Sequence, residues 1–98
     1  MSQQKCVLTV RVRQVNDSPA PFATISVFKI VPFLWWQIWS HVITVTADFY
    51  GEATVTLDKG MSYRVRAVWT GADGRRRETT EPIILTICPY TMTVRFTW

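Results

Sequence analysis

The sequence is poor in the residues from which metal sites and catalytic centres are built. It has one histidine and two cysteines, and the cysteines lie near opposite ends of the 98-residue chain. With its scattered carboxylates they match no known metal-ligand spacing. The four glycines do not form a phosphate-binding loop. We therefore expect no metal site and no cofactor.

Long hydrophobic runs are also absent. The most apolar stretch, residues 30–39, is interrupted by Pro32 and Gln37. It falls far short of the roughly 20 residues that a membrane-spanning helix needs. Residues 1–5 lead directly into alternating Val, Leu and Arg, without the continuous apolar region of a signal peptide. We expect no transmembrane segment, and no signal peptide is visible.

The only histidine, His41, directly follows Ser40. A nucleophile and its base must meet in space, with a third group that orients the base. Neighbouring residues on a strand point to opposite faces, so a strand through this dipeptide keeps the two side chains apart. We expect His41 to lie at the surface near a strand end, and we expect that the protein is not an enzyme.

What the sequence does contain is enough apolar material for one core. It is 48% hydrophobic and only 18% charged, with a net charge of +4. This composition is that of a folded chain rather than a disordered one. Its length fits a single domain over residues 1–98. The mild positive charge favours anionic partners.

An alternation of apolar and polar residues runs along most of the chain. In the first segment Leu8, Val10 and Val12 fall on one face, with Thr9 and Arg11 between them, as in a half-buried strand. Gly, Pro and Asp turns separate the segments. Strands are predicted at residues 6–15, 23–31, 41–46, 52–57, 63–69, 75–81 with 83–88, and 91–98. This pattern predicts an all-β fold, a seven-strand antiparallel Greek-key sandwich of the immunoglobulin-like kind.

Three stretches resemble a known family. Residues 18–27 contain a proline turn followed by Ala-x-Ile-x-Val, residues 46–57 contain Thr-x-Asp-x-x-Gly and a final Leu, and residues 59–67 read Lys-Gly-x-x-Tyr-x-Val-x-Ala. They are similar to the turns and strands of carboxypeptidase regulatory-like domains, over about residues 7–67 and the last strand. The resemblance implies a transthyretin-like sandwich whose motif residues are structural. Such domains serve as enzyme appendages, cell-surface adhesins and transporter extensions, so the fold says little about the role.

A run rich in tryptophan stands between two predicted strands, where polar turn residues are expected. We take the hydrophobic contact residues to be Phe33, Leu34, Trp35, Trp36 and Trp39. Large rigid rings on a surface contribute much contact area at a small entropic cost, which is typical of protein-contact sites. The same rings could stack on sugars or lie at a membrane interface. A further alternative is that the segment closes an open end of the sandwich and completes the core.

Arginines occupy the outward positions of several predicted strands. The candidate anion-binding residues are Arg11, Arg13, Arg64, Arg66, Arg75, Arg76, Arg77 and Arg95. If the strands of the five outward arginines share a sheet, these side chains make a ladder of guanidinium groups, and the three consecutive arginines at residues 75–77 add a cluster next to a hairpin tip. Such a surface suits nucleic acid or another polyanion. The alternative is an ordinary solvated face, because Thr and Arg suit exposed strand positions.

Cys6 and Cys88 have two readings. As a disulfide they would close a loop over most of the chain. As free thiols they would pack like small hydrophobic residues in the core.

Together these features favour a non-enzymatic binding or assembly module that acts through its Trp-rich segment. Its partner would be another protein or a second copy of the chain. Polyanion binding through the arginines and glycan binding on exposed tryptophans are the alternatives.

Overall fold

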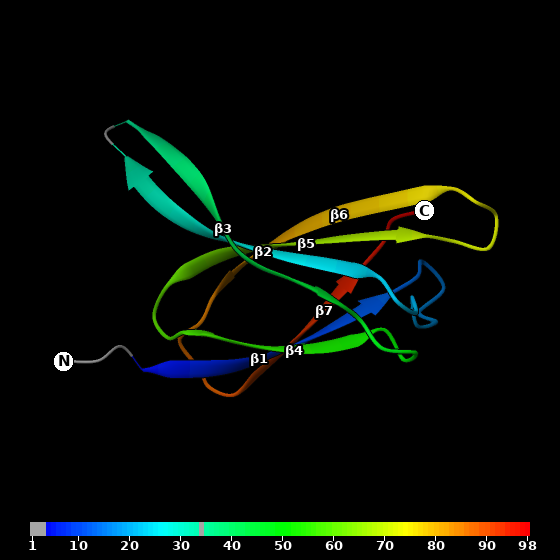
Figure 1. The fold of residues 1–98 in the computed structure, drawn as a ribbon, viewed down its shortest axis with the longest axis horizontal. Helices are drawn as coiled ribbons and strands as arrows, with labels where there is room; N and C mark the ends of the chain where they lie inside the picture. Colours follow the sequence, from blue (N-terminus) through cyan, green and yellow to red (C-terminus); the bar gives the residue numbers. More distant parts are fainter. Residues whose placement is uncertain (1–3, 34) are drawn as a thin grey trace.

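The structure is a computed structural model that describes residues 4–33 and 35–98. The described chain contains strands and no helix (Figure 1). The strands are β1 (Lys5–Arg13), β2 (Thr24–Phe33), β3 (Trp36–Thr46), β4 (Glu52–Asp58), β5 (Ser62–Thr70), β6 (Arg76–Ile84) and β7 (Tyr90–Arg95). The predicted all-β fold with seven strands is therefore confirmed.

The strands form two sheets that pack face to face. One has the order β4-β1-β7 and the other the order β3-β2-β5-β6. Alternate side chains of β1, β4, β5 and β7 point between the sheets, and β1 shows this most regularly, because Cys6, Leu8, Val10 and Val12 are buried. The core also contains Ile25, Val27, Val55, Leu57, Tyr63, Val65, Ala67, Leu85, Val94 and Phe96.

The expectation of a fully antiparallel sandwich is wrong for one pair of strands. β1 and β7 run parallel, with Leu8 opposite Tyr90 and Arg13 opposite Arg95. The cause is the connection before β7. β6 ends in one sheet at Ile84, and residues 85–89 cross to the other sheet at the end where β1 begins. β7 must then run in the same direction as β1.

A disulfide bond fixes this crossing. Cys6 near the start of β1 is joined to Cys88 just before β7, with the two Cα atoms 5.4 Å apart. That separation is typical of protein disulfides. The bond joins residues 82 positions apart in the sequence and ties the first strand to the last connection.

The turn before β4 is shaped by Asp48 and Gly51. Both Tyr50 and Glu52 donate their backbone N–H to Asp48 Oδ1, at 2.8 and 3.0 Å. Gly51 has a φ of +75°, and a Cβ atom there would lie 2.6 Å from the carbonyl oxygen of Val12. Only glycine fits this position without displacing β1.

At the other end of the molecule, β2 and β3 continue beyond the sandwich. β2 pairs with β5 only as far as Lys29 opposite Tyr63, but it pairs with β3 up to Phe33 opposite Trp36. The two strands therefore project as a ribbon, drawn in cyan to green at the upper left of Figure 1. We call residues 30–39 the arm.

The arm differs from the predicted strand ends near residues 31 and 41. No alternation of apolar and polar residues marks strands there, and the segment contains Pro32. Proline lacks a backbone N–H, which is harmful in the middle of a sheet but tolerated at an edge. Beyond Lys29, β2 pairs only with β3, so one side of the strand needs no donor.

Candidate functional site: the arm and its root

The arm brings together the tryptophans singled out in the sequence. Trp35, Trp36 and Trp39 are 91%, 51% and 48% exposed. Leu34 lies outside the described residues, and of Phe33 only the backbone pairing is described. The structure therefore places at least three large rings on the surface of one projecting ribbon.

The register of the two strands decides which side chains share a face. Ile30 lies opposite Trp39, and Val31 lies opposite Ile38. Val31 continues the row of Ile25 and Val27, which face the core, but it lies past the end of the sandwich. Val31 and Ile38 are consequently 37% and 43% exposed. Sequence reasoning missed these two residues, although a continuation of the period-two pattern past residue 30 would have found them.

The opposite face of the arm carries an aromatic cluster at its root. The ring of Phe28 lies 6.0 Å from that of Trp39 and 5.6 Å from that of His41. The guanidinium of Arg64, on β5, lies over the Trp39 ring at 5.8 Å. These contacts hold the root of the arm against the sheet, and each ring or cation–π pair of this kind contributes about 1 kcal/mol.

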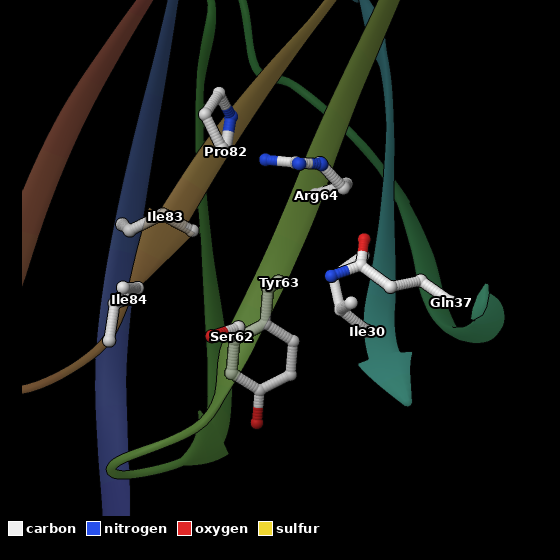
Figure 2. Close-up of a pocket in the computed structure, with 8 residues that line it drawn as sticks. All are labelled: Ile30, Gln37, Ser62, Tyr63, Arg64, Pro82, Ile83 and Ile84. Carbon is white, nitrogen blue, oxygen red and sulfur yellow. The ribbon is translucent and has the colours of Figure 1, made fainter. Parts of the chain in front are cut away.

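A shallow hollow lies beside this cluster. It encloses about 360 Å³ between the arm and the start of β5 and the end of β6. Figure 2 shows Ile30 and Gln37 on its arm side and Tyr63, Arg64 and Ile84 on its sheet side. The walls are mainly apolar, with the Gln37 amide and the Arg64 guanidinium as polar groups.

Tyr63 anchors the sheet side of the hollow. Its hydroxyl donates to the carbonyl oxygen of Asp58 and accepts from the N–H of the same residue, both at 3.0 Å. Burial raises the pKa of the Tyr63 hydroxyl above its usual value of 10.0. The tyrosine therefore holds the turn between β4 and β5 through its two hydrogen bonds to the Asp58 backbone.

The candidate anion-binding arginines do not share one sheet. Arg11, Arg13 and Arg95 belong to the sheet of β1 and β7, whereas Arg64 and Arg66 belong to the sheet of β5. The remaining three, Arg75, Arg76 and Arg77, lie at the turn between β5 and β6 and the start of β6. The structure thus spreads the eight arginines over two outer faces and one hairpin tip.

Many of these arginines have acidic partners. Arg11 contacts Glu52 at 2.7 Å, Arg66 contacts Glu78 at 2.7 Å, and Arg95 contacts Asp17. Arg76 reaches the same Glu78 at 3.5 Å. Arg66 hydrogen-bonds to Glu78 and lowers the pKa of that carboxyl. The positive charges are therefore partly neutralised within the chain.

Arg77 has the most partners of the eight. It contacts Asp73 at 2.9 Å, and its guanidinium lies 5.4 Å from the ring centre of Trp69 and 4.9 Å from that of Trp98. Hydrogen bonds from Arg77 and from the backbone N–H of Arg75 lower the pKa of Asp73 from 3.8 to about 2. This arrangement organises the hairpin tip farthest from the arm.

Ser40 and His41 lie opposite Lys29 and Phe28 in successive pairs of the ladder. His41 Nε2 forms a hydrogen bond with Thr44 Oγ1 at 2.7 Å. Over residues 4–33 and 35–98, no three His, Cys, Asp or Glu side chains gather as a metal site. Nor does the described part of the chain contain a helix able to cross a membrane.

Comparisons with known proteins give little beyond the fold. No family model matches this chain, and no curated protein matches it in sequence. Among solved structures it is similar to a 9R-lipoxygenase from Cyanothece PCC8801, with a TM-score of 0.50 and 15% sequence identity. The match covers 93% of this chain but only 16% of that enzyme. At such low identity the likeness concerns the fold of a small part of a much longer protein.

Proposed function

We propose that this protein is a non-enzymatic β-sandwich module that binds a protein partner through its arm. The observation that carries the proposal is the exposure of Trp35, Trp36 and Trp39 on one projecting ribbon. Tryptophan is the residue type that most often dominates the binding energy of protein interfaces. Contiguous exposed apolar surface of this kind is typical of partner sites.

The architecture of the arm supports this function. A two-stranded ribbon without a covering layer is marginally stable in water by itself. The arm keeps apolar side chains on both faces, because Val31 and Ile38 lie on one and Ile30 and Trp39 on the other. A partner that covers either face would remove this surface from water, which contributes about 25 cal/mol per Å².

The alternative functions have less support. A polyanion surface needs a dense array of available cations, whereas Arg11, Arg66 and Arg77 contact carboxylates. A sugar-binding tryptophan needs an open ring face, whereas the ring of Trp39 is approached by Phe28 and by Arg64. Trp35 remains the ring best placed for a glycan.

We also infer that the sandwich is related to transthyretin-like and carboxypeptidase regulatory-like domains. The support is that the resembling residues act as such motifs require. Asp48 and Gly51 build the turn before β4, and Tyr63 pins the next turn. A relation of this kind is consistent with an accessory role, because fold and function are only loosely coupled.

The test compares exposed tryptophans at the two ends of the molecule. The variant Trp36→Ala/Trp39→Ala is expected to keep its fold and to lose partner binding. Trp98→Ala is the matched control, since Trp98 is equally exposed but lies against Arg77 at the far end. A photo-reactive phenylalanine analogue placed at position 35 should form protein adducts, and the same analogue at Phe49, an exposed site on the body, should not.

The proposal fails if Trp36→Ala/Trp39→Ala folds normally and leaves both the adducts and the sedimentation coefficient unchanged. It also fails if the control Trp98→Ala reduces the adducts by the same factor.

A further inference from the structure

The four edge strands of the two sheets differ in how they are protected. Exposed edges invite pairing with other chains, and proteins usually guard them with charges, proline or short length. β7 is short, with six residues, and β4 has Glu52 and Asp58 at its ends. β6 has charges along its length and Pro82. β3 is the longest edge, with 11 residues, and contains no Asp, Glu, Lys, Arg, Pro or Gly.

The unpaired backbone groups of an edge strand favour another strand as the partner. Alternate residues of β3 direct their backbone N–H and C=O groups away from β2, and these groups are best satisfied by another strand. Lipid chains offer no hydrogen-bonding groups for this ladder. The register irregularity between Val27 and Phe28 interrupts β3 near Val42 and divides the edge into two regular segments, residues 36–41 and residues 43–46. The longer one contains the segment of β3 within the arm.

We infer that two copies of this chain join edge to edge, with the arm segments of β3 antiparallel about a two-fold axis near Ile38 and Trp39. The inference rests on the proposed function and names its partner. The two four-stranded sheets would become one sheet of eight strands through the arms. Side chains at positions 36 and 38 of both copies would share one face, and those at 37 and 39 the other.

A second copy fits this edge better than a foreign strand of unspecified sequence. The edge carries no Asp, Glu, Lys or Arg, so two copies can pair without like-charge contacts. An antiparallel arrangement places the two bodies at opposite ends of the joined arms, which separates their net charges of +4. Such charges are screened over about 8 Å at physiological ionic strength. The two-fold contact also gives a closed dimer, because its own edge strands β3 are used up. The other edge of each four-stranded sheet is β6, which is guarded by its charges and Pro82.

Charge substitutions at the two-fold axis test the inference. The wild-type chain is expected to sediment as a dimer under oxidising conditions. Ile38→Lys places two ammonium groups beside each other and should raise the dimer dissociation constant more than about tenfold without unfolding the monomer. Ile87→Lys, at an exposed isoleucine in the crossing before β7, is the matched control and should leave dimerisation unchanged.

A mixing experiment shows whether the two arms meet at the same residue. Ile38→Lys and Ile38→Glu should each be monomeric alone and should form a heterodimer when mixed, because opposite charges then face each other. In the wild type, hydrogen exchange of backbone amides in residues 37–40 should slow as the protein concentration rises.

Three results would overturn the inference: a wild-type monomer at all concentrations, a dimer that Ile38→Lys leaves intact, or mixed variants that stay apart. A blue shift of Trp fluorescence on phosphatidylcholine vesicles without dimerisation would also overturn it in favour of lipid contact. The wild type could be monomeric while its adducts at position 35 still disappear in Trp36→Ala/Trp39→Ala. In that case a second copy of this chain is the wrong partner, but the proposed function stands.

Discussion

In β1, Leu8, Val10 and Val12 are fully buried between two sheets, whereas in the arm Val31, Ile38 and Trp39 stay well exposed. Both regions are strands, and Val31 in the arm continues the alternate positions of Ile25 and Val27, which face the core. What differs is how far they are covered, because the arm side chains stay exposed and β2 has no β5 beside it beyond Lys29. The comparison shows that apolar patterning predicts a buried face only where a second sheet is present to bury it.

Charge separates the two regions in the same way. The body carries its ion pairs on its outer faces and hairpin tip, as between Arg11 and Glu52 or Arg77 and Asp73. The outer strand of the arm, from Trp36 to Ser40, has no charged residue. The ion pairs therefore lie on the body, and the arm, with its exposed tryptophans, is the contact surface that we propose. Variants in the body should therefore change stability, and variants in the arm should change binding.

The largest expected effect on the body comes from its disulfide. The variant Cys6→Ser/Cys88→Ser should lower the free energy of unfolding by roughly 4 kcal/mol, because the bond closes a loop over most of the chain and restricts the unfolded state. Guanidinium unfolding followed by circular dichroism measures this loss. Disulfides persist mainly in oxidising compartments, so the bond also favours that setting for the protein.

Dimerisation through the arm provides the comparison for the cysteine variant. In buffer where the variant remains folded, dimerisation should be unchanged, because neither cysteine lies in the arm. A loss of stability below about 1 kcal/mol would contradict the predicted contribution of the disulfide. A dimer that is weakened together with the fold would contradict the separation of body and arm.

A smaller effect is expected from one leucine of the core. Leu8→Ala should lower the free energy of unfolding by about 3 kcal/mol, because the side chain is fully buried and leaves a cavity. Trp35→Ala removes a larger side chain but should change stability by less than about 0.5 kcal/mol, because the ring is exposed. Urea unfolding of both variants makes the comparison, and equal losses would show that the arm is part of the core.

The body is the region that its sequence predicts well. The row of Leu8, Val10 and Val12 and the turn at Gly51 follow from local rules, namely the period of a strand and the backbone freedom of glycine. Both cysteines were identified as a candidate pair, although a buried thiol at each position fitted the sequence equally well. These features depend on a residue and its near neighbours.

The rest depends on how distant segments meet. The parallel pairing of β1 with β7 follows from the crossing at residues 85–89, which no local pattern predicts. The separation of Arg11 from Arg64 onto different sheets has the same origin. In the arm, Pro32 is tolerated within β2 because no third strand lies beside it there, and this depends on where β5 ends its pairing.

The smallest expected effect lies at the hairpin tip farthest from the arm, where Arg77 hydrogen-bonds to Asp73. The pKa of Asp73 falls from 3.8 to about 2 in the folded chain, so the pair stabilises the fold fully above pH 4 and loses this contribution as the pH falls through about 2. Asp73→Asn should therefore be less stable than the wild type at pH 6 and equally stable near pH 2. Thermal unfolding at a series of pH values measures the difference, and a carboxyl titration by NMR with a midpoint near 4 would contradict it. The interaction lies at the hairpin tip between β5 and β6, away from β3, so dimerisation should be the same in Asp73→Asn and the wild type.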